Sequence, residues 1–220
     1  MTTRLTIRHL LASTVLVGAF IAGHAQAATA TKDFAACVWD GTSDADRTAL
    51  AGDPSHLSGS GAFDKLAQDH PSANAAFDQC RGGTTTPALW KGHFLFNLGM
   101  EHWAMNQLKA KAVDADHLET AWTSLPAPQQ ACLGILTAWA IVEVNKSDEA
   151  NLSSTLGACN ASPARDGMQS FMHALNLDAQ SDAGKLAGMY AFGKGGEAIV
   201  LGLMTHAEAT AAGASPSQAQ

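Results

Sequence analysis

The chain has 220 residues, of which 13 are Lys or Arg and 20 are Asp or Glu, and 46% of its residues are hydrophobic. This apolar content excludes a disordered chain, and the acidic balance argues against a nucleic-acid-binding protein, which normally has a surplus of basic residues. Alanine occupies 43 positions, whereas Val and Ile together occupy only 12. Because strands of sandwiches and barrels are rich in β-branched residues, the composition predicts an all-α protein.

The N-terminus has the three parts of a secretory signal. Arg4 and Arg8 provide positive charge, residues 10–23 are apolar, and Ala25 and Ala27 form a small-x-small cleavage site. The apolar stretch is about 14 residues long, too short to cross a bilayer core of roughly 30 Å as a helix. This pattern predicts export, so we expect the protein to be periplasmic or secreted.

The sequence predicts three parts of the chain. We expect residues 1–27 to be the removed signal peptide, residues 28–212 to form one all-α domain, and residues 213–220 to be a flexible tail. Removal of the signal takes away two arginines and no acidic residue, so the net charge changes from −7 to −9. An acidic surface disfavours nucleic acid and anionic lipid, and no later segment is apolar enough to span a membrane.

The N-terminal half predicts short helices before a long one. We expect a helix over residues 31–40, a surface loop over 41–61 with a short turn after Asp44, and two helices within 62–81 that are divided at Pro71 and capped by Ser72. The sequence Thr86-Pro87 indicates a helix start, with Thr86 as the N-cap. That helix is expected to continue to about residue 112.

The C-terminal half predicts further helices joined by short connections. Asp114 or Asp116 is expected to cap a helix that ends at Ser124. The other expected helices cover residues 129–145, 147–159, 163–177, 181–192 and 196–212. Between the last two, Lys194 to Glu197 is interpreted as a turn, because the resemblance of residues 188–195 to a phosphate-binding loop fails where Ser or Thr is required. The whole predicts a single-domain helical bundle or an antiparallel helical-hairpin array.

The cysteines predict two disulfides. All four lie beyond the signal, and an exported protein meets an oxidising compartment. The pairs Cys37–Cys80 and Cys132–Cys159 close the most local loops and are favoured over the two other pairings. No Cys-x-x-Cys sequence occurs, which leaves thioredoxin-like chemistry and c-type haem attachment without their signature.

The helix after Pro87 holds the most informative polar residues. His93, Asn97 and Glu101 follow one another at four-residue steps, and Glu101 falls within an otherwise apolar stripe. A carboxyl on an apolar face must be hydrogen-bonded, paired or neutralised, which can create a ligand contact or a catalytic acid. The same spacing also suits a satisfied core network along one helix. His102 and Lys91 are expected on the solvent side.

Glu143 is a second carboxyl in apolar surroundings. With His93 and Glu101 it could complete a metal site between helices, but no Glu-x-x-His sequence supports a di-iron site. Met100, His102 and Met105 could suggest copper, but helical geometry points Met100 away from the other two. No cofactor or metal is therefore expected.

These observations support one leading function and one alternative. The leading hypothesis is an exported binding or interaction protein, without an evident catalytic motif, whose partner is an unknown protein or small molecule. The alternative is an enzyme or a cofactor or metal carrier that uses His93, Asn97, Glu101 and Glu143 as a cluster between helices.

Overall fold

The computed structural model describes residues 31–52, 62–84, 86–134, 159 and 162–211. All regular secondary structure in these residues is helical, which confirms the all-α prediction. The helices are residues 31–41, α2 (Asp44–Leu50), α3 (Ala62–Asp69), α4 (Pro71–Cys80), α5 (Ala88–Ala110), α6 (Ala115–Thr123), α7 (Ala127–Leu133), α10 (Ser162–Ala174) and α11 (Asp182–Ala211). None of the described helices has the length and hydropathy needed to cross a membrane.

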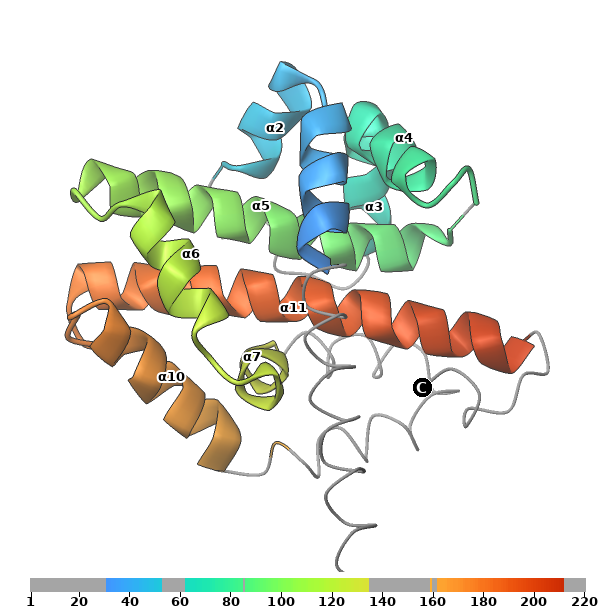
Figure 1. The fold of residues 1–220 in the computed structure, drawn as a ribbon. Helices are drawn as coiled ribbons and strands as arrows, with labels where there is room; N and C mark the ends of the chain where they lie inside the picture. Colours follow the sequence, from blue (N-terminus) through green and yellow to red (C-terminus); the bar gives the residue numbers. More distant parts are fainter. Residues whose placement is uncertain (1–30, 53–61, 85, 135–158, 160–161, 212–220) are drawn as a thin grey trace, which may run out of the picture.

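Two long antiparallel helices, α5 and α11, organise the molecule (Figure 1). The helix of residues 31–41 (blue in Figure 1) and helices α2, α3 and α4 lie on the side of α5 that faces away from α11. Helices α6, α7 and α10 surround the N-terminal half of α11. The long pair is therefore in contact with short helices from both halves of the sequence.

Buried apolar residues form two clusters along the long pair. The first packs the N-terminal half of α5 and the C-terminal half of α11 against the early helices. Its aromatic centre is Phe34, Phe77 and Phe94, whose rings meet edge to face with centroids 5.1 to 5.2 Å apart. The second packs the C-terminal half of α5 and the N-terminal half of α11 against α6, α7 and α10.

The two disulfides predicted from loop closure are confirmed. Cys37–Cys80 joins helix 31–41 to the end of α4, and its Cα atoms are 6.0 Å apart. Cys132–Cys159 joins α7 to the segment before α10, with Cα atoms 5.3 Å apart. Each bridge therefore fastens outer helices of one apolar cluster, and no cysteine is left as a free thiol.

Helix α11 corrects the predicted turn at Lys194 to Glu197. The helix continues through these residues from Asp182 to Ala211. A Cβ atom at Gly193 would lie 2.7 Å from the Asn97 carbonyl oxygen of α5. A Cβ atom at Gly195 would lie 2.5 Å from the backbone nitrogen of Gly134, just after α7. The glycines thus serve close packing of helices, and because no loop forms there, the resemblance to a phosphate-binding loop has no structural basis.

Several predicted caps are also wrong. Helix α4 has His70 at its N-cap, and the Ser72 hydroxyl instead donates to Asp46 over 2.5 Å. Helix α5 begins at Ala88 with Pro87 at its N-cap and no side-chain cap from Thr86.

Other boundaries differ by a few residues from those predicted. The expected loop after Gly41 contains α2, which Ser43 caps by accepting a hydrogen bond from the Asp46 amide. Asp114 occupies the expected N-cap position of α6 without making a side-chain bond. The predictions for residues 1–30, 135–158 and 212–220, and Glu143 with them, lie outside the described residues.

Candidate functional site

A charge cluster, buried around Lys194 and exposed at Lys32, lies between the two apolar clusters. It comprises Lys32 of helix 31–41, Glu101 of α5, Glu119 of α6, and Tyr190, Lys194 and Glu197 of α11. On α5, Glu101 falls between Leu98 of the first apolar cluster and Ala104 of the second. On α11, Lys194 likewise falls between Ala191 and Ile199. The charges therefore occupy the place where the two long helices cross from one core to the other.

Lys194 is the centre of this cluster. Its Nζ atom lies 3.4 Å from Glu101 Oε1 and 3.2 Å from Glu119 Oε2, and its side chain is only 9% exposed. Burial alone would lower the pKa of Lys194, but the nearby Glu101, Glu197 and Glu119 raise it above its ordinary value. Lys194 therefore remains an ammonium ion and ties α11 to both α5 and α6.

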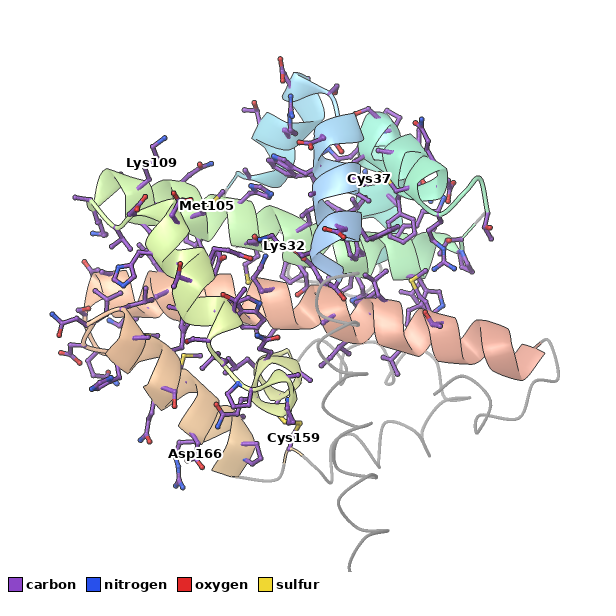
Figure 2. The ribbon with its side chains drawn as sticks, viewed as in Figure 1. Lys32, Cys37, Met105, Lys109, Cys159 and Asp166 are labelled. Atoms are coloured by element: carbon purple, nitrogen blue, oxygen red, sulfur yellow. A yellow bond between two sulfur atoms is a disulfide. The ribbon has the colours of Figure 1, made fainter. Side chains whose placement is uncertain are left out.

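Glu119 connects the buried charges to the surface. Its Oε2 atom accepts a hydrogen bond of 3.0 Å from the Tyr190 hydroxyl, and its Oε1 atom lies 2.9 Å from Lys32 Nζ. Figure 2 shows Lys32 near the end of helix 31–41 closest to α6 and α11. Burial raises the pKa of Glu119, but Lys194, Lys32 and Tyr190 outweigh it and hold the pKa below its ordinary value.

Glu197 differs from Glu119 in its protonation. Its side chain is 1% exposed, and Oε1 has no hydrogen-bond partner among the described residues. Burial, followed by the charge of Glu101 and a hydrogen bond to its side chain, raises the pKa of Glu197 well above the ordinary value. The protonated, neutral form of Glu197 is therefore favoured, because two adjacent buried carboxyls cannot both carry charge at low cost.

This protonation state makes the cluster electrically balanced. With Glu197 neutral, Glu101 and Glu119 face the ammonium groups of Lys194 and Lys32. Buried charges are tolerated when they are paired and hydrogen-bonded, so the cluster can hold the helices in register. Its available chemistry is the binding or release of one proton at Glu197, whose side chain is buried.

The structure brings only part of the predicted polar ladder together. The Asn97 side chain donates to the backbone carbonyl of His93 over 2.7 Å, and both residues are buried. The His93 ring stacks on Phe63 at a centroid distance of 4.0 Å, and its Nε2 atom has no hydrogen-bond partner among the described residues. Burial lowers the pKa of His93 to about 4, so the ring is neutral at pH 7. Of the three residues of the predicted ladder, Glu101 is the one that belongs to the charge cluster.

Two residues expected on the solvent side of α5 are instead packed against neighbours. Lys91 is buried, and its Nζ atom donates to Asn74 over 2.7 Å and to Asp78 over 2.5 Å. The His102 ring stacks on Trp39 with centroids 3.5 Å apart. The prediction failed because α5 is covered on several faces by the early helices and by α11.

Lys194, Glu197, Glu119, Tyr190 and Lys32 were missed as members of the site. A signal was present for two of them, since Lys194 and Glu197 are three residues apart and flanked by apolar residues. Because Lys194 to Glu197 was interpreted as a turn, the pair was not placed on a helix face and was missed. Glu119 and Lys32 lie on different short helices, and nothing in their local sequence indicates that they meet.

A second feature is an open depression of about 330 Å³ at the end of α10. Met168, Met172 and Leu177 provide its apolar side chains, and Gln169, His173 and Asp178 its polar ones. Asn176 has a φ of 52°, and the Leu177 amide donates to the Met172 carbonyl over 3.0 Å. This helix-terminating arrangement brings Leu177 back over Met172.

The charge cluster contains no evident metal site. In the part of the chain that the structure describes, no three His, Cys, Asp or Glu side chains are grouped so that they could hold a metal ion. No protein family, curated protein or solved structure matches this chain. What the charge cluster and the depression can bind is therefore inferred from the residues that form them.

Proposed function

We propose that this is an exported binding protein without chemistry of its own, and that a small molecule is its ligand. The observation that carries the proposal is the depression beside α10, where described apolar side chains line an open hollow in the surface. Its volume of about 330 Å³ lies at the lower end of the range for small-molecule sites. The depression suits a small, mainly apolar ligand held at its edge by polar groups.

Export is supported by the sequence and by the cysteines. The N-terminal pattern is that of a secretory signal, and all four cysteines of the chain form disulfides. Disulfides persist in oxidising compartments such as the periplasm and the extracellular space. We therefore propose a periplasmic or secreted location.

The charge cluster has a supporting role in this proposal. Glu101 and Glu197 are 7% and 1% exposed, so a substrate could reach them only if the surrounding helices moved. The opposite pKa directions of Glu197 and Glu119 would suit an acid–base pair, which is the strongest support for the catalytic alternative. Binding at the depression requires no such separation, and it is the function that we favour.

Titration with the apolar fluorophore 1-anilinonaphthalene-8-sulfonate tests this proposal. The folded protein should bind one fluorophore saturably, and Leu177→Ser should weaken binding about tenfold because it removes apolar surface from the depression. Met189→Ser is the matched control, because Met189 is a 39% exposed apolar residue of α11 outside the depression. The Met189→Ser variant should bind the fluorophore with the same affinity as the unaltered protein.

Two results would contradict the proposal. One is the absence of saturable binding to the folded protein, and the other is equal loss in Leu177→Ser and Met189→Ser. Glu101→Gln tests the alternative in the same titration, since it should leave fluorophore binding unchanged if the ligand occupies the depression. Loss of binding in that variant, with the fold retained, would instead place the ligand at the charge cluster.

A further inference from the structure

The two disulfides differ in their exposure to solvent. Cys132 and Cys159 are 3% and 8% exposed, so their bridge is shielded from reagents in solution. Cys37 is an exposed residue, and Cys80 is only partly buried at the end of α4. Figure 2 places Cys37 on helix 31–41 beside α4. One bridge is therefore enclosed by the fold, and the other lies at the surface.

Helix 31–41 is attached to the core by a face that does not include Cys37. On that face Ala35 and Val38 are 5% and 0% exposed, and the Trp39 ring stacks on His102 of α5 with centroids 3.5 Å apart. These contacts do not involve the bridge. Breaking the Cys37–Cys80 bond should therefore leave the helix in place and its two cysteines close enough to pair again.

We propose that the Cys37–Cys80 bridge is a site of reversible thiol–disulfide exchange with an external dithiol reductant. The Cys132–Cys159 bridge stays closed under the same conditions. Exposed protein disulfides are the labile or regulatory ones, because exchange requires access of a thiolate to one sulfur. The inference goes beyond the proposed function and is independent of it, since this bridge joins helix 31–41 to α4 and the depression lies beside α10.

The exchange proceeds in two steps. One thiolate of the reductant attacks the exposed sulfur, Cys37 Sγ, to form a mixed disulfide, and Cys80 leaves as a thiolate that takes up a proton. The second thiolate of the reductant then attacks its own sulfur in the mixed disulfide, and Cys37 leaves and is protonated. The reductant loses two electrons and two protons and becomes a disulfide, and the bridge gains them as two thiols. Helix 31–41 is then no longer tied to α4.

Differential alkylation of the folded, fully oxidised protein tests this proposal. The protein is treated with dithiothreitol, quenched with acid and alkylated with N-ethylmaleimide in urea, so that buried thiols are labelled as completely as exposed ones. Peptide mass spectrometry then gives the rate of reduction of each bridge. We expect Cys37 and Cys80 to be reduced about tenfold or more faster than Cys132 and Cys159. Equal rates, or the reverse order, would overturn the proposal.

The dependence of this rate on reductant and on urea separates direct attack from attack after unfolding. Reduction of the folded Cys37–Cys80 bridge should be first order in dithiothreitol and should not change at urea concentrations below the unfolding transition. A rate that reaches a plateau with dithiothreitol and rises with urea would show that the bridge reacts only after the protein opens. That result would overturn the proposal.

Single-cysteine variants test which sulfur is attacked. Cys80→Ser leaves Cys37 as a free thiol, and Cys37→Ser leaves Cys80. The Cys37 thiol should react with 5,5′-dithiobis(2-nitrobenzoate) several-fold faster than the Cys80 thiol in the folded variants, because Cys37 is the more exposed residue. The opposite order would overturn the assignment of Cys37. If either variant does not fold, the rates measured on the unaltered protein still decide between the two bridges.

Reversibility is measured on the partly reduced protein. After removal of dithiothreitol and addition of glutathione disulfide, Cys37–Cys80 should form again as the new bridge, with the helical circular dichroism unchanged throughout. Loss of the helical signal on reduction, or pairing of Cys37 or Cys80 with a cysteine of the other bridge, would overturn reversible exchange.

Discussion

At the scale of single residues, protonation follows from what each buried side chain contacts. Glu119 and Glu197 have the same side chain, yet the first contacts two lysines and a tyrosine while the second lies against another carboxyl. Their pKa values are therefore shifted in opposite directions. Buried His93 lies against Phe63 with no nearby charge to favour its protonated form.

Glu197→Gln should reduce the loss of stability as pH rises above about 4.5. The pKa of Glu197 is raised in the folded protein, so its contribution is present in acid and is lost as pH rises from about 4.5 toward the folded pKa. Glutamine imitates the protonated carboxyl and does not titrate. Across this window the fall in unfolding free energy should therefore become less steep by up to about 1.4 kcal/mol per pH unit.

Urea unfolding at a series of pH values measures this effect, and Glu119→Gln is its control. The pKa of Glu119 is lowered, so its contribution is present above the ordinary pKa of 4.5 and is lost as pH falls through the folded value. Glu119→Gln should thus destabilise the protein near pH 7, by about 1–3 kcal/mol. Parallel pH profiles for Glu197→Gln and the unaltered protein would refute a protonated Glu197.

The His93 ring should stay neutral down to mildly acidic pH. Its pKa of about 4 lies below the ordinary 6.5, so the unfolded chain takes up a proton first and stability is lost as pH falls between these values. NMR titration of the ring carbons, assigned by comparison with His93→Gln, measures the midpoint directly. A midpoint of 6 or above would contradict the burial of this ring.

At the scale of secondary-structure elements, glycine positions decide how closely α11 packs. Gly193 approaches the backbone of α5 and Gly195 approaches the residue after α7, whereas a Cβ atom at Gly202 would meet no described residue within 4 Å. Glycine in one helix thus has two different consequences. Where glycine allows two backbones to meet, packing requires it, and where no described residue approaches it, glycine only weakens the helix.

Gly193→Ala and Gly202→Ala form a matched pair that tests this difference. Alanine at Gly193 places a Cβ atom 2.7 Å from the Asn97 carbonyl oxygen, so α5 and α11 must separate at a cost of about 1–3 kcal/mol. Alanine at Gly202 should instead stabilise the helix by about 0.5–1 kcal/mol. Chemical unfolding of both variants is the measurement, and equal effects would show that α11 is not held against α5 at Gly193.

At the scale of the whole molecule, two apolar clusters are joined through α5 and α11, with the charge cluster between them. Each disulfide fastens short helices around one apolar cluster, and neither joins α5 to α11. The link between the two halves therefore depends on packing and on the charges around Lys194.

Removal of either disulfide should lower stability without changing the fold. The paired substitutions Cys37→Ser with Cys80→Ser should cost about 2–4 kcal/mol, because they release a loop constraint on the unfolded chain. Replacing Cys132 and Cys159 by Ser should lower the free energy of unfolding slightly less, since these cysteines are 27 rather than 43 residues apart. Urea unfolding with circular dichroism measures both, and unchanged midpoints would contradict a stabilising role for the bridges.

The sequence by itself determined the helical class and the approximate bounds of α5, and it favoured the two disulfide pairs that the structure shows. These depend on local composition, on loop closure and on breakers such as Pro87, which act over short distances. It also indicated that Glu101 lies on an apolar face. It did not determine the course of α11, since glycine in a turn and glycine at a helix contact look alike until the neighbouring backbone is known.

Only the tertiary structure decided what the polar residues do. Glu101 meets Lys194 and Glu197 because α5 and α11 run antiparallel and in contact, and Glu119 reaches the same place from α6. These contacts join segments far apart in the chain, so no local periodicity of the sequence predicts them. The burial that sets the charge and the exposure of each side chain exists only after the helices have packed.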